Sequence, residues 1–278
     1  MDDLISLKQV SFRYGWRAPC LLERIDLTLG AGMIYGLLGK NGEGKTTLFR
    51  LIAGLNPVMS GVIRTLGQDP FGRAPSLMGE LFLVPEEIYF PAMKAPDYAK
   101  YYGSFYPNFS MDDFLGNLRE FKVPETQTLS SMSQGQRKKA YMAFALACHT
   151  RILLMDEPTN GLDIDSKVVF RKMLAAASTP DRLIIISTHQ VLDFEALING
   201  VIVLDEHRIA LCATTDRLLE RFVFGTLGED ETPVYKVETH RGMRAVGLRV
   251  STPKQGLEEL DLELLFEAAT HAGLADKL

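Results

Sequence analysis

The sequence predicts an α/β fold with a mixed β-sheet, an N-terminal antiparallel β subdomain, a helical insert and a small C-terminal α+β appendage. Three observations lead to this prediction. Several short apolar runs lack polar alternation, which is typical of strands buried on both faces. A glycine-rich loop joins one apolar strand to a helix, and patterns of helical period fill the middle of the chain. At 278 residues the chain can bury a substantial core.

Antiparallel strands are predicted near the N-terminus. Leu4–Val10, Ile25–Leu29 and Gly61–Leu66 alternate or cluster apolar residues between turn signals. Met33–Leu38 is an apolar strand that runs into a glycine-rich loop, and a helix follows from Lys45 to about Ala53. This strand–loop–helix unit places the loop at one edge of a sheet.

Three further runs are predicted to be strands of a parallel sheet covered by helices: Leu81–Val84, Ile152–Met155 and Leu183–Ser187. A helical insert occupies about residues 91–148, between the first and the second of them. Its predicted helices are Asp97–Tyr106, one that begins at Ser110 with Asp113 three residues later, and one from Gln134 to about Cys148.

Aromatic residues in the first of these helices follow the helical period. Tyr98, Tyr101, Tyr102 and Phe105 have i, i+3, i+4, i+7 spacing. The pattern indicates an apolar stripe in the core of the insert. The alternative is a groove that receives a helix of a partner protein.

The character of the sequence changes after Thr226. The predicted elements there are a linker (228–233), two strands (Val234–Thr239 and Ala245–Val250) and a helix (Leu262–His271). We therefore divide the chain into a domain of residues 1–222 and an appendage of residues 223–278. Because the linker is polar, we expect the first domain to fold without the appendage.

Charge argues against a nucleic-acid partner. The formal net charge is −5, with 25 acidic and 24 basic residues in 1–222 and 10 acidic and 6 basic residues in 223–278. Binding through phosphates favours a broad basic face, which this balance does not provide. The run Arg137-Lys138-Lys139 is interpreted as a solvated helix face.

Apolar runs and cysteines indicate a cytoplasmic, reduced protein. The longest apolar run, Ala140–Cys148, has nine residues, whereas a membrane-spanning helix needs roughly 18. The start Met-Asp-Asp-Leu has no basic leader pattern. The three cysteines, Cys20, Cys148 and Cys212, are scattered and lack the spacing of metal ligands.

Gly39-Lys40-Asn41-Gly42-Glu43-Gly44-Lys45-Thr46 fits the phosphate-binding loop pattern. Glycines let backbone N–H groups approach a phosphate, and the following helix adds the positive end of its dipole. Lys45 is predicted to reach the β- and γ-phosphates, and the Thr46 hydroxyl to bind Mg²⁺.

A second motif is the strand Ile152–Met155, which ends in Asp156 and Glu157. After a phosphate-binding loop, such a pair predicts that Asp156 holds Mg²⁺ and that Glu157 polarises the attacking water. Together the two motifs predict a P-loop nucleoside triphosphatase.

The residues around these motifs resemble those of ATP-binding-cassette (ABC) ATPases. Ser133-Gln134-Gly135-Gln136 is similar to the family's signature sequence, and Pro158–Asp163 to its dimer-contact loop. His189 resembles the switch histidine, and Tyr14 the aromatic residue that stacks on adenine. These motifs follow the family's order and cover about residues 4–220.

The resemblance implies an ABC ATPase core in which each ATP lies between the phosphate loop of one chain and the signature of a second. It implies that hydrolysis involves Glu157, His189, Lys45, Ser133 and Glu86. The implied ATP-binding residues are Tyr14, Gly39, Asn41, Gly42, Gly44, Lys45, Thr46, Thr47, Ser133, Gly135, Gln136 and Asp163. The implied Mg²⁺ ligands are Thr46, Asp156 and Glu86.

The chain departs from the family pattern at two positions. Glu86, in Val84-Pro85-Glu86-Glu87, stands where the family usually has glutamine, and Gln134 replaces the first glycine of the signature. A carboxylate accepts a cation but donates no hydrogen bond, and it repels a γ-phosphate. Glu86 is therefore either a functional substitute or a surface carboxylate.

The resemblance implies ATP hydrolysis that powers a separate multi-span permease at the inner face of the membrane, with a second ATPase subunit as partner. The segment Leu260–Phe266 resembles ATPases of two-gene ABC-2-type exporter systems. The first alternative is a non-transport ABC ATPase of the cofactor-assembly type. A metabolite kinase would leave the signature, Asp163 and His189 without a role.

Overall fold

The structure is a computed structural model that describes residues 3–189, 193–227, 231–239, 242–249 and 260–278. Its centre is a six-stranded sheet in the order β5-β6-β7-β3-β8-β9. The first five strands are parallel, and β9 is antiparallel to β8. The bounds are β3 Met33–Leu38, β5 Leu81–Val84, β6 Ile152–Asp156, β7 Leu183–Ser187, β8 Gly200–Asp205 and β9 Arg208–Thr214. The predicted mixed sheet is confirmed.

Alternate residues of the buried strands enter two apolar clusters, one on each face of the sheet. On β6, Leu153 and Met155 belong to the cluster that also contains residues of helices α5 (Gln134–Ala147), α6 (Ile164–Ala177) and α8 (Leu262–His271). Ile152 and Leu154 belong to the cluster that also contains residues of helix α1 (Lys45–Ile52). Both sides of each strand are therefore apolar, which explains the runs without polar alternation.

The N-terminal antiparallel sheet has the order β2-β1-β4 and packs over α1 (Lys45–Ile52). Its strands are β1 Asp3–Phe12, β2 Leu22–Gly30 and β4 Ser60–Thr65. The three predicted strands and the helix at Lys45 are confirmed, with ends that differ by a few residues.

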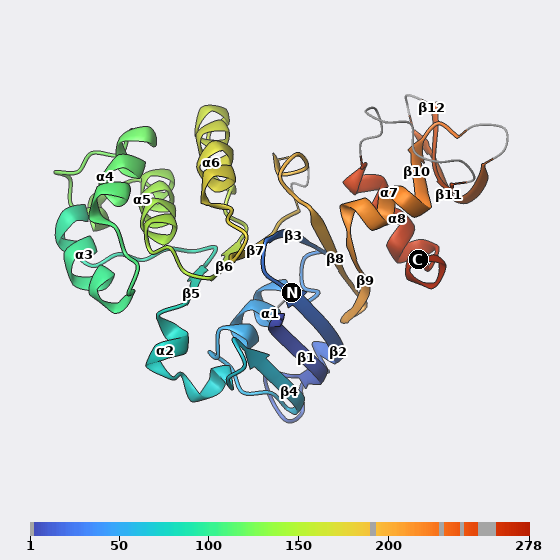
Figure 1. Cartoon of the computed structure of the whole chain (residues 1–278), viewed down its shortest axis with the longest axis horizontal. Coiled ribbons are helices and arrows are strands. Elements are labelled where there is room, and N and C mark those ends of the chain that lie inside the picture. Colours follow the sequence, from blue (N-terminus) through green and yellow to red (C-terminus); the bar gives the residue numbers. More distant parts are fainter. Residues whose placement is uncertain (1–2, 190–192, 228–230, 240–241, 250–259) are drawn as a thin grey trace.

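The helical insert lies on the opposite side of the molecule from the C-terminal appendage (Figure 1). Its helices are α2 Pro75–Met78, α3 Ala95–Tyr102, α4 Met111–Glu120 and α5 Gln134–Ala147; α6 Ile164–Ala177 stands beside it. Ser110 caps α4 by accepting the Asp113 N–H, as predicted. The helix predicted for 97–106 starts and ends earlier, because Gly103 opens a short 3-10 turn.

The aromatic stripe of α3 is only partly core. Tyr98 is 7% exposed, whereas Tyr101 and Phe105 are 63% and 64% exposed. The interpretation of the whole stripe as core was therefore wrong for two of its members, which lie on the surface of the insert.

The C-terminal part forms a three-stranded antiparallel sheet in the order β10-β12-β11. Its elements are α7 Thr215–Arg221, β10 Phe222–Gly225, β11 Thr232–Thr239, β12 Gly242–Leu248 and α8 Leu262–His271. The two predicted strands and the predicted helix are found, while residues 228–230 of the predicted linker and Val250 lie outside the described residues. The division at residues 222 and 223 stays a proposal.

Helix α8 is packed against residues of the central sheet. Leu262, Leu264 and Leu265 are at most 2% exposed and share one apolar cluster with β7, β8 and the helical insert. The continuous cluster argues against the expectation that residues 1–222 fold alone, because removing α8 would expose part of that core.

We expect Leu265→Ala to lower the free energy of unfolding by about 2–5 kcal/mol, the usual loss for a fully buried leucine. Urea denaturation measures this loss. Glu263→Ala, on the exposed face of the same helix, is the control and should change it by less than about 0.5 kcal/mol. Equal stability of both variants would show that α8 is not part of the core.

Candidate active site

The phosphate loop connects β3 to α1, and two of its glycines have left-handed backbones. Gly42 has φ 89° and Gly44 has φ 110°. A Cβ on Gly44 would also lie 2.9 Å from Leu22 Cδ2. Glycine is therefore needed at position 44 both for its conformation and for the close approach of β2.

Lys45 folds its ammonium back onto the loop. Its Nζ donates to the carbonyl oxygens of Gly39 at 2.6 Å and Lys40 at 3.2 Å, and the residue is 7% exposed. Burial lowers the pKa of Lys45, and the nearby carboxylates Glu157 and Asp156 oppose that shift. The loop backbone thus fixes a buried positive charge at the head of α1.

Asp156, the last residue of β6, is 3% exposed and is held by two hydroxyl groups. Thr46 Oγ1 donates to its Oδ2 at 2.6 Å, and Ser187 Oγ donates to its Oδ1. These contacts connect the ends of β6 and β7 to the first turn of α1. A buried carboxylate requires such partners.

Glu157 leaves β6 with a left-handed backbone of φ 45°, which is unusual for a residue with a side chain. Its N–H donates to the carbonyl oxygen of Ser187 at 3.1 Å. Its Oε2 lies 2.9 Å from Nδ1 of His189, which follows β7. The strained backbone turns the carboxylate toward His189 and the phosphate loop.

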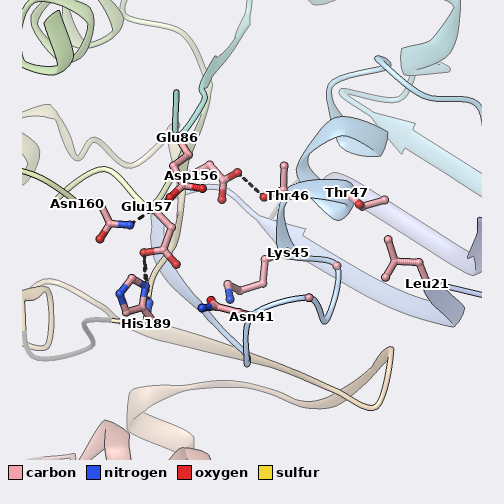
Figure 2. A pocket seen from close by; sticks show the side chains of 12 residues that line it. Leu21, Asn41, Lys45, Thr46, Thr47, Glu86, Asp156, Glu157, Asn160 and His189 are labelled. Atoms are coloured by element: carbon pink, nitrogen blue, oxygen red, sulfur yellow. Dashed lines mark hydrogen bonds and ion pairs between the residues drawn. The ribbon is translucent and has the colours of Figure 1, made fainter. Parts of the chain in front are cut away.

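These side chains meet in one cavity of about 500 Å³, and Figure 2 shows Lys45, Asp156, Glu157 and His189 around it. The residues that line it are Leu21, Asn41, Gly42, Gly44, Lys45, Thr46, Thr47, Glu86, Asp156, Glu157, Asn160 and His189. Most of the residues expected to act on ATP therefore lie together. Tyr14 reaches the edge of this group through its hydroxyl, 3.0 Å from Thr47 Oγ1, and its ring is 59% exposed.

Six predicted site residues do not line this cavity: Tyr14, Gly39, Ser133, Gly135, Gln136 and Asp163. Ser133 caps α5 by accepting the Gln136 N–H, and the Gln136 side chain accepts the Ser133 N–H in return. Asp163 caps α6 by accepting the Ser166 N–H at 2.8 Å. Within one chain Ser133, Gln136 and Asp163 therefore act as helix caps, and Asp163 also accepts a hydrogen bond from Lys139 at 3.4 Å.

The sequence analysis did not assign three residues that lie near Asp156 and Glu157. Ser187 and Asn160 lay inside recognised segments without being assigned a role, and Asn160 Nδ2 donates to Glu86 Oε1 at 3.3 Å. Lys138 was placed on a solvated face, yet it is 4% exposed. That placement was wrong, because the ammonium donates to the carbonyl oxygen of Glu157 at 2.6 Å.

Oxygen ligands suited to Mg²⁺ gather on one side of the cavity. Thr46 and Asp156 are in contact there, and Glu86 lies on the same wall. The described residues include no cluster of three or more His, Cys, Asp or Glu side chains that could hold a metal. Magnesium in nucleotide sites is bound by one or two carboxylates plus phosphate oxygens, so the residues present fit the ion.

Known proteins share this arrangement. The model of the ABC transporter family matches residues 22–160, which include the phosphate loop, Ser133–Gln136, Asp156 and Glu157. The chain belongs to the ABC transporter family. It is an ATP-binding protein of that family, whose ATP-binding domains hydrolyse ATP.

This ABC ATPase is similar in sequence to transporter ATP-binding proteins of other bacteria, and two of them serve as examples. The ABC transporter ATP-binding protein YtrB of Bacillus subtilis is 28% identical, over 73% of this chain and 70% of the relative. The Nod factor export ATP-binding protein I of Cupriavidus metallidurans is 28% identical, over 75% of this chain and 70% of its own length. Import and export proteins both occur among the curated relatives.

The fold of this ABC ATPase matches that of a solved ATP-binding subunit of an ABC transporter. The TM-score is 0.69 at 22% identity, and the match covers 77% of this chain and 91% of that one. The predicted ABC ATPase core is thereby confirmed. Among the described residues, none of the helices combines the length and apolar character that crossing a bilayer requires.

The position of Glu86 leads to a prediction. If its carboxylate acts on the cation or on water, Glu86→Ala should lower kcat about fivefold or more while changing ATP affinity less, because the group stabilises the reacting state more than bound ATP. Glu86→Gln should stay active, since the amide keeps an oxygen ligand and a contact to Asn160. Steady-state hydrolysis and calorimetry measure the two quantities.

Glu87→Ala, at the exposed neighbouring position, is the matched control. A Glu86→Ala variant with the kcat of the control would leave Glu86 as a surface carboxylate without a catalytic role.

Proposed function

We propose that this ATPase powers export through a separately encoded membrane permease and works as a head-to-tail dimer at the inner face of the membrane. The observation that carries the proposal is the meeting of Lys45, Glu157 and His189 in one cavity at the ends of three neighbouring parallel strands. The exporter assignment is supported by the Nod factor export relative and by the resemblance of Leu260–Phe266 to two-gene exporter ATPases.

In the proposed reaction Lys45 binds the phosphates, and Thr46, Asp156 and Glu86 would hold Mg²⁺. The ion, when bound, would offset negative charge on the phosphate oxygens. Glu157 polarises the attacking water, because its carboxylate faces the cavity and is oriented by His189 at 2.9 Å. The backbone amides of Asn41, Gly42 and Gly44 bind phosphate oxygens, and Tyr14 stacks on the base.

The dimer is proposed because the signature residues lie outside the cavity of their own chain. Ser133 begins a helix of 14 residues, and its hydroxyl and the helix N-terminus are suited to a γ-phosphate. Ser133 is exposed, so a second chain can present its cavity to it. Gly135 and Gln136 would join Ser133 in that contact, and Asp163 would contact the partner from the adjoining loop.

A groove on the helical insert is the proposed docking surface for the permease. It has a volume of about 500 Å³ and lies between α2 and α3. Aromatic residues dominate its wall: Phe82, Tyr98, Tyr102, Phe105, Tyr106, Tyr141 and Phe144. A groove with an aromatic wall, in which Phe105 is 64% exposed, favours the binding of a short helix, here one from the membrane subunit.

We predict that Glu157→Gln binds ATP, hydrolyses it very slowly and accumulates as a dimer. The amide keeps the shape of the carboxylate but loses its ability to polarise water, so ATP remains as the bridge between two chains. Light scattering with ATP and Mg²⁺ should show a shift from monomer to dimer mass.

Ser133→Arg in the Glu157→Gln background should abolish that dimer, because a bulky side chain enters the nucleotide site of the other chain. Ser131→Arg, at an exposed position before α5, is the control. A dimer that survives Ser133→Arg would refute the assigned role of the signature, and no ATP-dependent dimer at all would refute the homodimer.

The groove gives a separate prediction. Phe105→Asp should remove the co-purifying multi-span membrane protein, while basal hydrolysis stays within about twofold, because the charge enters an apolar contact far from the nucleotide. Met243→Asp, at a position 56% exposed on β12, is the control.

If only the Met243→Asp variant fails to co-purify with the membrane protein, the docking surface lies on the appendage and not in the groove. If no membrane protein co-purifies with the wild-type chain, the cofactor-assembly alternative is favoured.

A further inference from the structure

Lys138 lies in the second turn of α5 and points away from solvent. Its ammonium donates to the main-chain carbonyl oxygens of Glu157 at 2.6 Å and Asn160 at 3.1 Å. The signature helix is thereby connected to the turn that follows β6. Ala140, Met142 and Ala143 on the same helix are buried apolar residues.

An ammonium is costly to place there, and burial lowers the pKa of Lys138. The path of the chain after Asp156 provides hydrogen-bond acceptors that offset this cost of burying the ammonium. With a left-handed Glu157, the backbone leaves the sheet, and the carbonyls of Glu157 and Asn160 face α5. The carbonyl of Glu157 also accepts the Asn160 N–H at 3.3 Å, and Lys138 adds a charged donor to it and to the half-buried carbonyl of Asn160.

The ammonium also faces the negative charge of the catalytic site. The carboxylates that act on Lys138 are those of Glu86, Glu157 and Asp156. Glu86 accepts a hydrogen bond from Asn160, whose carbonyl Lys138 holds. The Lys138 ammonium thus stabilises the turn through the carbonyls of its backbone. It also offsets the negative charge of the three carboxylates.

We propose that Lys138 is a positioning residue for ATP hydrolysis, which holds the Glu157–Asn160 turn so that the Glu157 carboxylate stays beside His189 and faces the nucleotide cavity. This inference rests on the proposed function, namely that Glu157 polarises the attacking water. Lys138 itself contacts neither ATP nor water in this role and acts through the backbone of Glu157.

The first test replaces Lys138 by methionine, which has a similar length and suits a buried site. We expect kcat to fall about 10- to 100-fold, the loss typical when a catalytic group is misplaced by roughly 1 Å. The KM for ATP should change less than about threefold, because Lys45 and the phosphate loop are untouched. Lys172→Met, at an exposed position on α6, is the matched control and should keep both values.

Lys138→Gln provides a second variant with a neutral donor for one of the two carbonyls, and its kcat should lie between those of Lys138→Met and the wild type. If Lys138→Met folds and keeps a kcat within about twofold of the wild type, the proposal is overturned. Equal losses in kcat and ATP affinity in both variants would also overturn it. So would failure of both to fold, since Lys138 would then be required for folding alone.

The second test combines Lys138→Met with Glu157→Gln in single-turnover hydrolysis. Because Lys138 acts through Glu157, the double variant should be less than about twofold slower than Glu157→Gln alone. A much larger further loss would show that Lys138 acts elsewhere, and only the inference would fail. A Glu157→Gln variant with wild-type kcat would instead refute the proposed function, whatever Lys138 does.

Discussion

The carboxylate of Asp156 lies between two hydroxyl donors, one from a helix and one from the central sheet. Thr46 reaches it from the first turn of α1, and Ser187 reaches it from the end of β7. Both contacts require β3, β6 and β7 to be parallel and in register, with Asp156 and Leu37 each paired to Ser187. The phosphate loop, Glu157 and His189 follow directly on these strand ends, so this register sets every distance in the site.

Charge balance is the second constraint on the site. Asp156, Glu157 and Glu86 surround the place where ATP would add further negative charge. Lys45 faces them from the phosphate loop and Lys138 faces them from the signature helix. A carboxylate at position 86, where the family usually has a neutral amide, adds a negative charge that acts on Lys138 and makes this second ammonium more important.

Much of the fold could be predicted because buried strands and capped helices leave local signals. β3, β5, β7 and α8 were predicted with the bounds that the structure has, since each is an uninterrupted or amphipathic run. The packing of α8 onto the ATPase part depends on contacts between residues far apart in the sequence, and no local pattern reveals them. For the same reason the exposed side chains of Tyr101 and Phe105 could not be separated from buried Tyr98 by spacing alone.

The site was predicted less evenly. Lys45, Asp156 and Glu157 belong to motifs whose spacing has a chemical cause, and the structure brings them together. Lys138 stands in a run of three basic residues, and such runs are ordinarily solvated. Only the path of the chain after β6 brings one of them inward, where its ammonium donates to the carbonyl oxygens of Glu157 and Asn160.

The left-handed backbone at Glu157 restricts which amino acids position 157 can carry. A β-branched residue is strongly disfavoured at φ 45°, whereas glycine, asparagine and aspartate tolerate it. Of these, only aspartate keeps a carboxylate, and its shorter side chain would withdraw that group from His189. Position 157 requires a backbone with φ near 45° and a side chain long enough to reach His189. Glutamate has the required length, but its backbone is strained in this conformation. The backbone angle and the distance to His189 therefore restrict the amino acids at position 157 even apart from the need for a carboxylate.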